Sequence, residues 1–350
     1  DNIGIYYYYY QLDDNEEIQS IDSIYTFNGL EKDSVHTITV RVVDAAGNEA
    51  SATDEVTVGL RAGDVILASA NPPTGQTTDW TGGTTYYYTG NPNNWVQFGG
   101  FWWRIIRING DGSIRMIYQG TSANTTGTGT QIGTSAFNSS YNNNMYVGFK
   151  YTSEEVHGTE TNSTILGASS SSSLNTWYSN NLADDAEYID GNAGFCGDRT
   201  PSTSSSSNNG SGGTGTTTTY YGAYIRLHNK GSESASLQCD SRDVYTTTDS
   251  SSGNKSLTYP IGLLTADEAA LAGVTWSNPQ SSYLNTGQHY WTMSPSVYDG
   301  RAYMFRVISP GSLGSWFVDD ANGVRPVINL KSAIALTGSG TTSDPFVVVS

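Results

Sequence analysis

The feature of this sequence that most constrains its fold is the stretch from Tyr290 to Leu330, which combines aromatic, apolar and turn residues at strand spacing. Within it, residues 301–309 alternate β-branched and aromatic side chains with a period of two, which predicts a β-strand. Successive side chains of a strand point to opposite faces. One face therefore carries Tyr303, Phe305 and Val307, and the other carries Ala302, Met304, Arg306 and Ile308.

The face that carries Arg306 is the candidate functional surface. Because a charged side chain is rarely buried without a partner, we expect this face to be exposed and the opposite face to pack against the core. Exposed apolar residues beside a charge, with a tryptophan a short loop away, are typical of a binding surface. The alternative is a strand buried on both faces, with Arg306 in a salt bridge. The candidate ligand-binding residues are Arg301, Met304, Arg306, Ile308, Trp316 and Asp320.

Charge and composition exclude several classes of function. The 33 acidic residues outnumber the 16 basic ones, which gives a net charge of −17 and argues against nucleic acid or an anionic membrane as the main partner. No apolar run approaches the roughly 20 residues of a membrane-spanning helix. Abundant Gly, Ser, Thr, Asn and Tyr favour an extracellular, β-rich protein with many turns. The first residue is Asp1 and no secretory signal is present, so we expect a mature fragment or a piece of a longer protein.

The chain contains two cysteines, Cys196 and Cys239. Two cysteines alone do not make a structural zinc site, and neither lies in a Cys-x-x-Cys motif. In an exported chain they are expected to form a disulfide across the low-complexity segment between them. Such a bond stabilises a protein by about 3–4 kcal/mol, chiefly by restricting the unfolded chain.

The first 59 residues are expected to form a small β-module, with strands at 5–12, 37–43 and 55–58. The module resembles bacterial Ig-like and fibronectin-type-III modules. The resemblance rests on the corner at residues 27–30, on the Thr-x-x-Val-x-Val strand that begins at Thr37, and on the turn at residues 44–48. It implies a β-sandwich that serves as a stalk or spacer on an exported protein.

In such a module two further strands would precede the strand at Ile5. A sandwich without them exposes sheet edges and core, which natural proteins avoid. One explanation is that the native protein continues upstream. The other is that a second chain supplies the strands by β-augmentation, which would make this chain a filament subunit.

The remaining residues predict a larger α+β domain. Residues 60–94 read as a linker with a leading strand at 64–67. Two strands follow between Trp95 and Asn109, with a tight turn or bulge at Gly99 and Gly100 between them. The Asn-Gly-Asp-Gly sequence at 109–112 predicts a hairpin into residues 113–118. Helices are expected at 174–182 and, with Thr265 as N-cap, at 265–273. A strand is expected at 220–227, surface loops at 120–165, and a flexible Ser/Thr/Gly-rich loop at 200–219.

Residues 95–350 resemble the C-type-lectin-like fold in its formylglycine-generating-enzyme-like branch, as found in surface proteins of gut bacteria. The matching segments are 95–118, the helix start at 263–268, the Tyr-Trp-Thr-Met-Ser-Pro sequence at 290–295, and 323–330 with its Val-Arg-Pro. In target proteins of diversity-generating retroelements that share this fold, the ligand-contacting residues lie between the Ser-Pro and the Val-Arg-Pro. The resemblance thus points to the same segment, 301–320, as the alternation of residues does.

No catalytic site is expected. The enzymes of that branch hold copper with two cysteines near the C-terminus, and this chain has none after Cys239. The histidines are scattered, and no hydrolase, zinc-protease or phosphate-loop motif occurs. No cofactor is expected, although four acidic residues at one helix end suit calcium. The alternative for them is a solvated helix end. These residues are Asp184, Asp185, Glu187 and Asp190.

The sequence therefore predicts a mainly β fold, with an incomplete N-terminal Ig-like sandwich and a C-terminal C-type-lectin-like α+β domain. The expected function is non-catalytic binding or adhesion at the bacterial cell surface, with a protein or a glycan as ligand. The alternative is a structural subunit of an extracellular filament or pilus that is assembled by strand complementation. A hydrolase or modifying enzyme is the third and least favoured interpretation.

Overall fold

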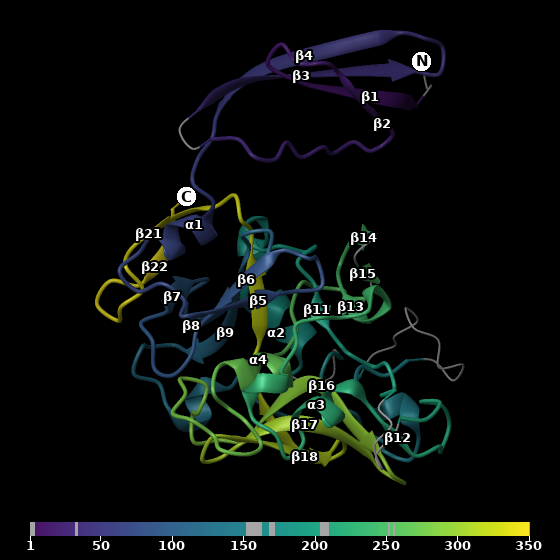
Figure 1. The fold of residues 1–350 in the computed structure, drawn as a ribbon, viewed down its shortest axis with the longest axis vertical. Helices are drawn as coiled ribbons and strands as arrows, with labels where there is room; N and C mark the ends of the chain where they lie inside the picture. The colour runs from purple at the N-terminus through teal and green to yellow at the C-terminus, as the bar shows by residue number, and fades with distance from the viewer. Residues whose placement is uncertain are drawn as a thin grey trace. The chain divides into compact units, whose positions relative to one another are not determined.

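The computed structural model describes residues 4–31, 34–151, 163–167, 172–203, 210–250, 253–254 and 256–349. The chain forms two compact units, Asp1–Arg61 and Ala62–Ser350, and its fold is mainly β, as predicted (Figure 1). Residues 62–94 lie within the second unit, so they are part of its fold rather than a linker. None of the described helices is both long and apolar enough to cross a bilayer.

The first unit contains one antiparallel sheet with the strand order β2-β1-β3-β4. The turn between β3 and β4 forms because Asp44 Oδ1 accepts hydrogen bonds from the backbone N–H groups of Ala46 and Asn48. The strands are β1 (Ile5–Leu12), β2 (Ile18–Ser20), β3 (Val35–Asp44) and β4 (Glu49–Thr57).

One face of this sheet is apolar and only partly covered. The register places Tyr8 opposite Val42, Tyr10 opposite Val40 and Leu12 opposite Ile38, so these six side chains share a face. Tyr25 stacks on Tyr10 with ring centres 5.3 Å apart. Of the hydrophobic residues described in this unit, Tyr10 alone is fully buried. The described residues thus supply one sheet and part of its cover, and not the second sheet of a sandwich.

The second unit contains two large sheets. The first has the order β20-β9-β8-β7-β22-β21, with β6 also paired to β8. Gly99 and Gly100 have φ values of +58° and +77° and form the tight turn between β7 and β8, as predicted. The predicted hairpin at 109–112 is also confirmed, since Asn109 and Ser113 pair across it. The strands are β5 (Gly75–Thr78), β6 (Thr84–Tyr87), β7 (Trp95–Phe98), β8 (Phe101–Ile108), β9 (Ile114–Gly120), β20 (Val327–Leu330), β21 (Ala335–Thr337) and β22 (Phe346–Val349).

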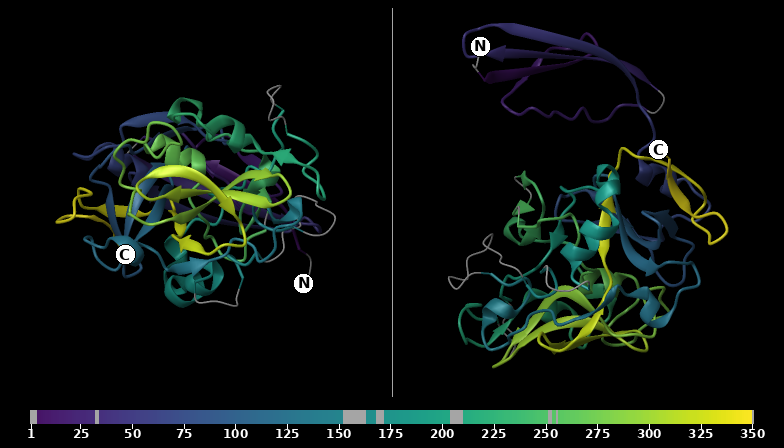
Figure 2. Two further views of the ribbon diagram at one scale, coloured as in Figure 1. Left: turned by 90° about the horizontal axis from the view of Figure 1, so that it is seen from below. Right: turned by 180° about the vertical axis from the view of Figure 1, so that it is seen from behind.

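The second sheet has the order β10-β19-β16-β17-β18, and β12 pairs with β16. Figure 1 and the right-hand view of Figure 2 show the blue strands β7–β9 and the yellow-green strands β16–β18 as two separate layers of this unit. The strands are β10 (Gly133–Ser135), β12 (Thr219–Tyr220), β16 (Tyr290–Tyr298), β17 (Ala302–Ile308), β18 (Ser312–Phe317) and β19 (Asn322–Val324). Two short ribbons complete the unit: β11 (Phe195–Cys196) with β13 (Val244–Tyr245), and β14 (Asp249–Ser250) with β15 (Gly253–Asn254).

The helices are short. Helices α2 and α4 are where the sequence predicts them, and Thr265 and Glu268 form a reciprocal capping box at the start of α4. The α-helices are α1 (Ala62–Leu67), α2 (Leu174–Asn181), α3 (Gly222–Leu227) and α4 (Ala266–Leu271). The 3₁₀ helices are η1 (Gly127–Thr130), η2 (Asn144–Tyr146), η3 (Ala183–Tyr188), η4 (Ser232–Ser234) and η5 (Ser241–Asp243).

Two predicted strands are wrong. Residues 64–67 belong to α1, and most of residues 220–227 belong to α3. In α3, Ala223 and Leu227 are buried four residues apart, which is helical spacing. A run of six to eight residues does not distinguish this spacing from a strand.

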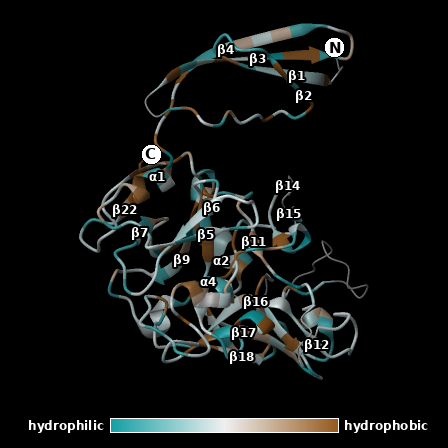
Figure 3. Ribbon diagram, viewed as in Figure 1, coloured by the Kyte–Doolittle hydropathy of each residue, from teal (hydrophilic) through white to brown (hydrophobic). Residues whose placement is uncertain are grey.

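The segment 120–165 is not a set of surface loops. Phe137, Val147, Phe149 and Ile165 are fully buried in the core of the second unit; residues 152–162 lie outside the described part. In Figure 3 the brown, hydrophobic parts of this unit lie largely on strands and helices. The predicted disulfide between Cys196 and Cys239 is present, and it joins residues 43 positions apart. The predicted loop 200–219 is described except for 204–209, and its end forms β12.

Candidate binding surface

The candidate surface lies on β17 and β18, and β18 is the last strand in the order of its sheet. The two strands pair in a regular antiparallel register that places Met304 opposite Trp316 and Arg306 opposite Gly314. Side chains of directly opposed residues share a face. The sequence is therefore correct that Arg306 and Trp316 lie on one side of this hairpin.

Arg306, Trp316 and Asp320 form one connected group. The guanidinium carbon of Arg306 lies 4.1 Å from the centre of the Trp316 ring. Trp316 Nε1 donates a 2.6 Å hydrogen bond to Asp320 Oδ2, and Arg306 Nη1 donates one of the same length to Asn322 Oδ1. Trp316 remains 39 % exposed. Arg306 is thus held by a ring and an amide, and not by the salt bridge of the alternative reading.

Arg301 extends this group along the edge of the sheet. Its guanidinium carbon lies 3.7 Å from the centre of the Phe317 ring and 4.3 Å from that of Tyr141, and it forms a 3.0 Å ion pair with Asp319. The Phe317 and Trp316 rings are 5.7 Å apart. We call the whole set the Arg–aromatic surface; it comprises Tyr141, Arg301, Arg306, Trp316, Phe317, Asp319 and Asp320.

Met304 does not belong to this surface. It is completely buried, and the backbone N–H of Gly148 lies 3.0 Å from its sulfur. The expectation that Met304 is exposed is therefore wrong. The reason is that the segment 133–149 covers this face of the sheet: Trp291 Nε1, next to Arg306 in the register, donates to the carbonyl of Ser135. Ile308 is half-buried against Gly314 and lies at the margin.

Partial burial shifts the pKa values of two basic side chains at this surface, Arg306 and His289. Burial lowers the pKa of Arg306, and nearby Asp320 acts in the opposite direction. The pKa of His289 is also lowered, first by burial and then by the positive charge of Arg306. Its Nδ1 accepts a hydrogen bond from the backbone N–H of Ser309. Both effects favour the neutral form of His289, and this hydrogen bond fixes its ring as a structural residue.

Two members of the surface were missed in the sequence. Phe317 alternates onto the other face of β18 from Trp316, so strand alternation does not indicate it, yet its ring contacts both Trp316 and Arg301. Tyr141 lies in a segment interpreted as loop, far from Arg301 in the chain. No local pattern identifies such a contact.

The four acidic residues near η3 do not converge. Asp185 lines a cavity beside β7 and β8, whereas Asp190 lines a different one beside Lys331 and Tyr259. The pKa of Asp185 is raised by burial and by the like charges of Asp184 and Glu187. Among the described residues no three His, Cys, Asp or Glu side chains are grouped as a metal site would require. Calcium binding remains an untested expectation.

The densest group of charges is buried and lies elsewhere, between β8, β9 and α4. Arg107 Nε donates to Glu268 Oε1 at 2.8 Å, Arg115 Nε lies 2.5 Å from the same oxygen, and Arg107 lies 3.5 Å from Asp79. All four side chains are at most 2 % exposed. Two positive and two negative charges balance there. We call this set the buried charge network: Asp79, Arg107, Arg115 and Glu268.

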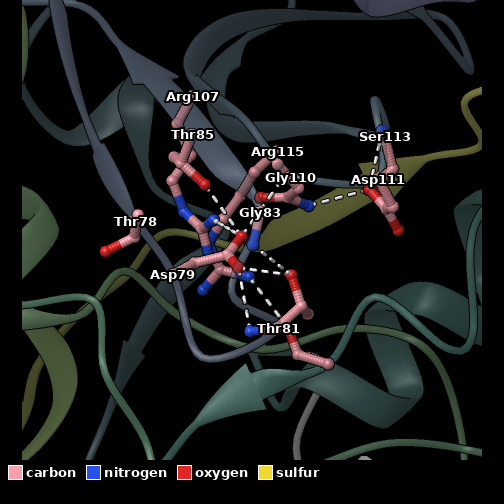
Figure 4. Close-up of polar contacts among 12 residues, drawn as sticks. Thr78, Asp79, Thr81, Gly83, Thr85, Arg107, Gly110, Asp111, Ser113 and Arg115 are labelled. Carbon is pink, nitrogen blue, oxygen red and sulfur yellow. Dashed lines mark hydrogen bonds and ion pairs between the residues drawn. The ribbon is translucent and has the colours of Figure 1, made fainter.

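Each carboxylate of the network has further partners. Figure 4 shows Asp79 at the centre of hydrogen bonds from Thr81, Thr85 and the backbone of Gly110. Burial alone would raise the pKa of Asp79 and Glu268, but these bonds and the arginine charges lower both below their usual values. The network is buried and includes Glu268 of the α4 capping box, so it joins α4 to β8 and β9.

Comparison of the chain with protein-family models, with curated proteins and with solved structures finds no match. The geometry of the chain itself is therefore the basis for a functional assignment.

Proposed function

We propose that this chain is an extracellular, surface-displayed binding or adhesion protein without catalytic activity, and that its second unit recognises a protein ligand through the Arg–aromatic surface. The observation that carries the proposal is the continuous stacking of Tyr141, Arg301, Phe317, Trp316 and Arg306 along one sheet edge. Trp, Tyr and Arg are the residue types that contribute most binding energy in protein interfaces.

The surface is also ordered before binding. Each guanidinium lies against a ring and is hydrogen-bonded, so these long side chains lose little freedom when a partner docks. Asp319 and Asp320 neutralise part of the positive charge. Such a surface fits a partner with apolar groups and a few carboxylates or carbonyl oxygens better than a highly charged one.

An extracellular location fits two features. A disulfide bond persists in oxidising compartments, and uncharged polar residues with tyrosine dominate the sequence. The proposal retains the expected domain types, an Ig-like stalk and a C-type-lectin-like head. The support for them is the antiparallel sheet of the first unit and the mixed strands and helices of the second.

The test is a binding screen of the folded chain against arrays of extracellular proteins and of glycans, repeated with Trp316→Ala and Arg306→Ala. Loss of the captured protein ligand by both variants, with retained folding, supports the proposal. Arg242→Ala is the matched control, because Arg242 is an exposed arginine whose partner is a local ion pair. Unchanged binding by all three variants would contradict the assignment.

A second candidate function is a structural subunit of a filament, and the first unit favours it. Its apolar sheet face is only partly covered, and β4 is the last strand in the sheet order. A strand from another copy would pair with this edge, and a further segment of that copy would pack on this face. Electron microscopy and light scattering at rising protein concentration decide between the two: regular polymers support the filament, and monomers throughout exclude it for this chain.

A further inference from the structure

A cavity of about 470 Å³ opens in the second unit at the tip of the β7–β8 hairpin, beside η3 and β22. This volume lies in the range of roughly 300–1,000 Å³ that is typical of small-molecule sites. None of its lining residues belongs to the Arg–aromatic surface. It is therefore a separate site, and it does not depend on the proposed function.

The hairpin turn explains why a hollow exists there. A Cβ on Gly99 would lie 2.5 Å from Leu182 Cδ2 and 3.3 Å from Asp185 Oδ2, so the turn is pressed against the start of η3. A Cβ on Gly100 would have no atom within 4 Å. The turn therefore brings Asp185 to one wall and leaves the space in front of Gly100 open.

Four aromatic residues line the remaining wall together with Gln97, Val347 and Val348, and their rings are held in place by neighbours. Phe98 and Tyr188 meet edge to face with centres 6.3 Å apart. Trp102 meets Trp95 in the same way at 5.9 Å, and Phe101 packs on Trp177 at 5.2 Å. Phe101, Trp102 and Tyr188 are only half-buried, so part of each ring stays open to a ligand.

The polar groups at the cavity define the charge of its ligand. Gln97 is exposed and lies directly opposite Trp102 in the strand pairing, so its amide stands beside the indole. Asp185 contributes a carboxylate, and Asp184 and Glu187 lie next to it in the chain. The lining residues include no lysine or arginine. An anionic ligand would therefore meet uncompensated repulsion.

We propose that this cavity binds a neutral sugar residue. The apolar C–H face of a pyranose ring would stack on the open rings, as apolar surfaces do on aromatic side chains. Its hydroxyl groups would donate to the Asp185 carboxylate and would both donate to and accept from the Gln97 amide. The aromatic rings offer a stacking face, Asp185 offers only acceptors, and Gln97 offers a donor and an acceptor. Together these groups match a neutral ring that carries several hydroxyl groups.

The test uses a panel of neutral disaccharides, namely maltose, cellobiose, lactose and chitobiose, titrated into the intact chain by calorimetry and by saturation-transfer NMR. We expect at least one to bind, and an acidic disaccharide that contains glucuronic acid to bind more weakly. Gln97→Ala removes a ligand hydrogen bond and Asp185→Asn replaces a charged acceptor by a neutral amide, so each should weaken binding about tenfold. Trp102→Ala should abolish it.

Two controls separate the outcomes. Val349→Ala, on the same strand as Val347 but outside the lining, should bind normally. Trp316→Ala should also bind sugar normally while it loses the protein ligand, so failure of one proposal is distinguishable from failure of the other. If Trp102→Ala does not fold, the Gln97 and Asp185 variants decide.

The inference is overturned if no neutral sugar binds at millimolar concentration, or if bound sugar is insensitive to both the Gln97 and the Asp185 substitution. Tetramethylammonium is the third probe. Binding of this cation, without binding of any neutral sugar, would replace the inference with a site for organic cations, held by the rings and the acidic residues.

Discussion

Arg306 and Trp316 lie on neighbouring strands, with the guanidinium of one 4.1 Å from the ring centre of the other. The sequence places them on one face, but their contact depends on the register of β17 with β18. Arg306 therefore holds the exposed Trp316 indole in place and also contributes a positive charge to the surface. This arrangement makes the surface rigid without burying it.

A double-mutant cycle measures this support. Arg306→Ala, Trp316→Ala and the double variant should give a coupling free energy of unfolding of about 0.5–1 kcal/mol, as for a cation–π pair near the surface. All eight tryptophans lie in the second unit, so tryptophan fluorescence during urea unfolding reports on that unit alone. A coupling energy of zero would show that the two side chains are neighbours without mutual stabilisation.

The sequence predicted elements whose signals are local. The hairpin at Asn109, the capping box at Thr265 and the disulfide each depend on residue types at short spacing or on a pair of cysteines. The binding face was predicted only in part. The alternation along β17 correctly predicts the face of Arg306, and the short connection to β18 places Trp316 near it. Met304 has the same alternation but is buried. The alternation gives the face of a strand and not what covers that face.

What covers β17 comes from far away in the chain. Residues 133–149 pack over Trp291 and Met304, and Tyr141 reaches Arg301 from the same segment. The wider segment 120–165 is rich in Gly, Thr and Asn, a composition that favours surface loops. Val147 and Phe149 do follow strand spacing, which continues to Tyr151, but Phe137 has no periodic neighbours that mark it as core.

The burial of Met304 has a direct consequence for stability. Met304→Ala should destabilise the second unit by about 2–5 kcal/mol, because it leaves a cavity between the sheet and residues 133–149. Met304→Leu is the control and should cost less than about 1.5 kcal/mol, since volume is nearly conserved. Chemical unfolding followed by tryptophan fluorescence provides the values. If Met304→Ala has the same free energy of unfolding as wild type, Met304 is not part of the core and belongs to the binding surface.

We expect a single substitution in the buried charge network to cause a large loss of stability. Glu268→Gln keeps the shape of the side chain and its ability to cap α4, but it removes the negative charge that Arg107 and Arg115 share. Two buried arginines then face Asp79 alone, and the expected loss is about 3–5 kcal/mol.

The matched control for this variant is Arg242→Gln, which breaks an exposed ion pair with Asp240 and should cost less than about 1 kcal/mol. Both variants are compared by urea unfolding at neutral pH. If Glu268→Gln unfolds like wild type, α4 is held by apolar packing and the network contributes little.

The environment of Asp198 leads us to expect that the free energy of unfolding of the second unit depends on pH. It shares Arg226 with Asp267, at 2.5 Å and 2.8 Å respectively. Burial, together with the negative charge of Asp267, raises the pKa of Asp198 to about 6 although Arg226 acts against it. The folded protein therefore holds this proton more tightly than the unfolded chain does. The stability that Asp198 contributes is complete below a pH of about 4 and is lost as the pH rises through about 6.

Asp198→Asn removes this dependence with little other change, because asparagine also tolerates the positive φ of 42° at this position and Arg226 keeps Asp267. The melting temperature of wild type minus that of the variant should thus be largest near pH 4 and fall between pH 4 and 6. Asp299→Asn, at an exposed carboxyl group, controls for the general loss of one negative charge. A difference that grows with pH would instead mean that Arg226 outweighs burial and lowers the pKa of Asp198.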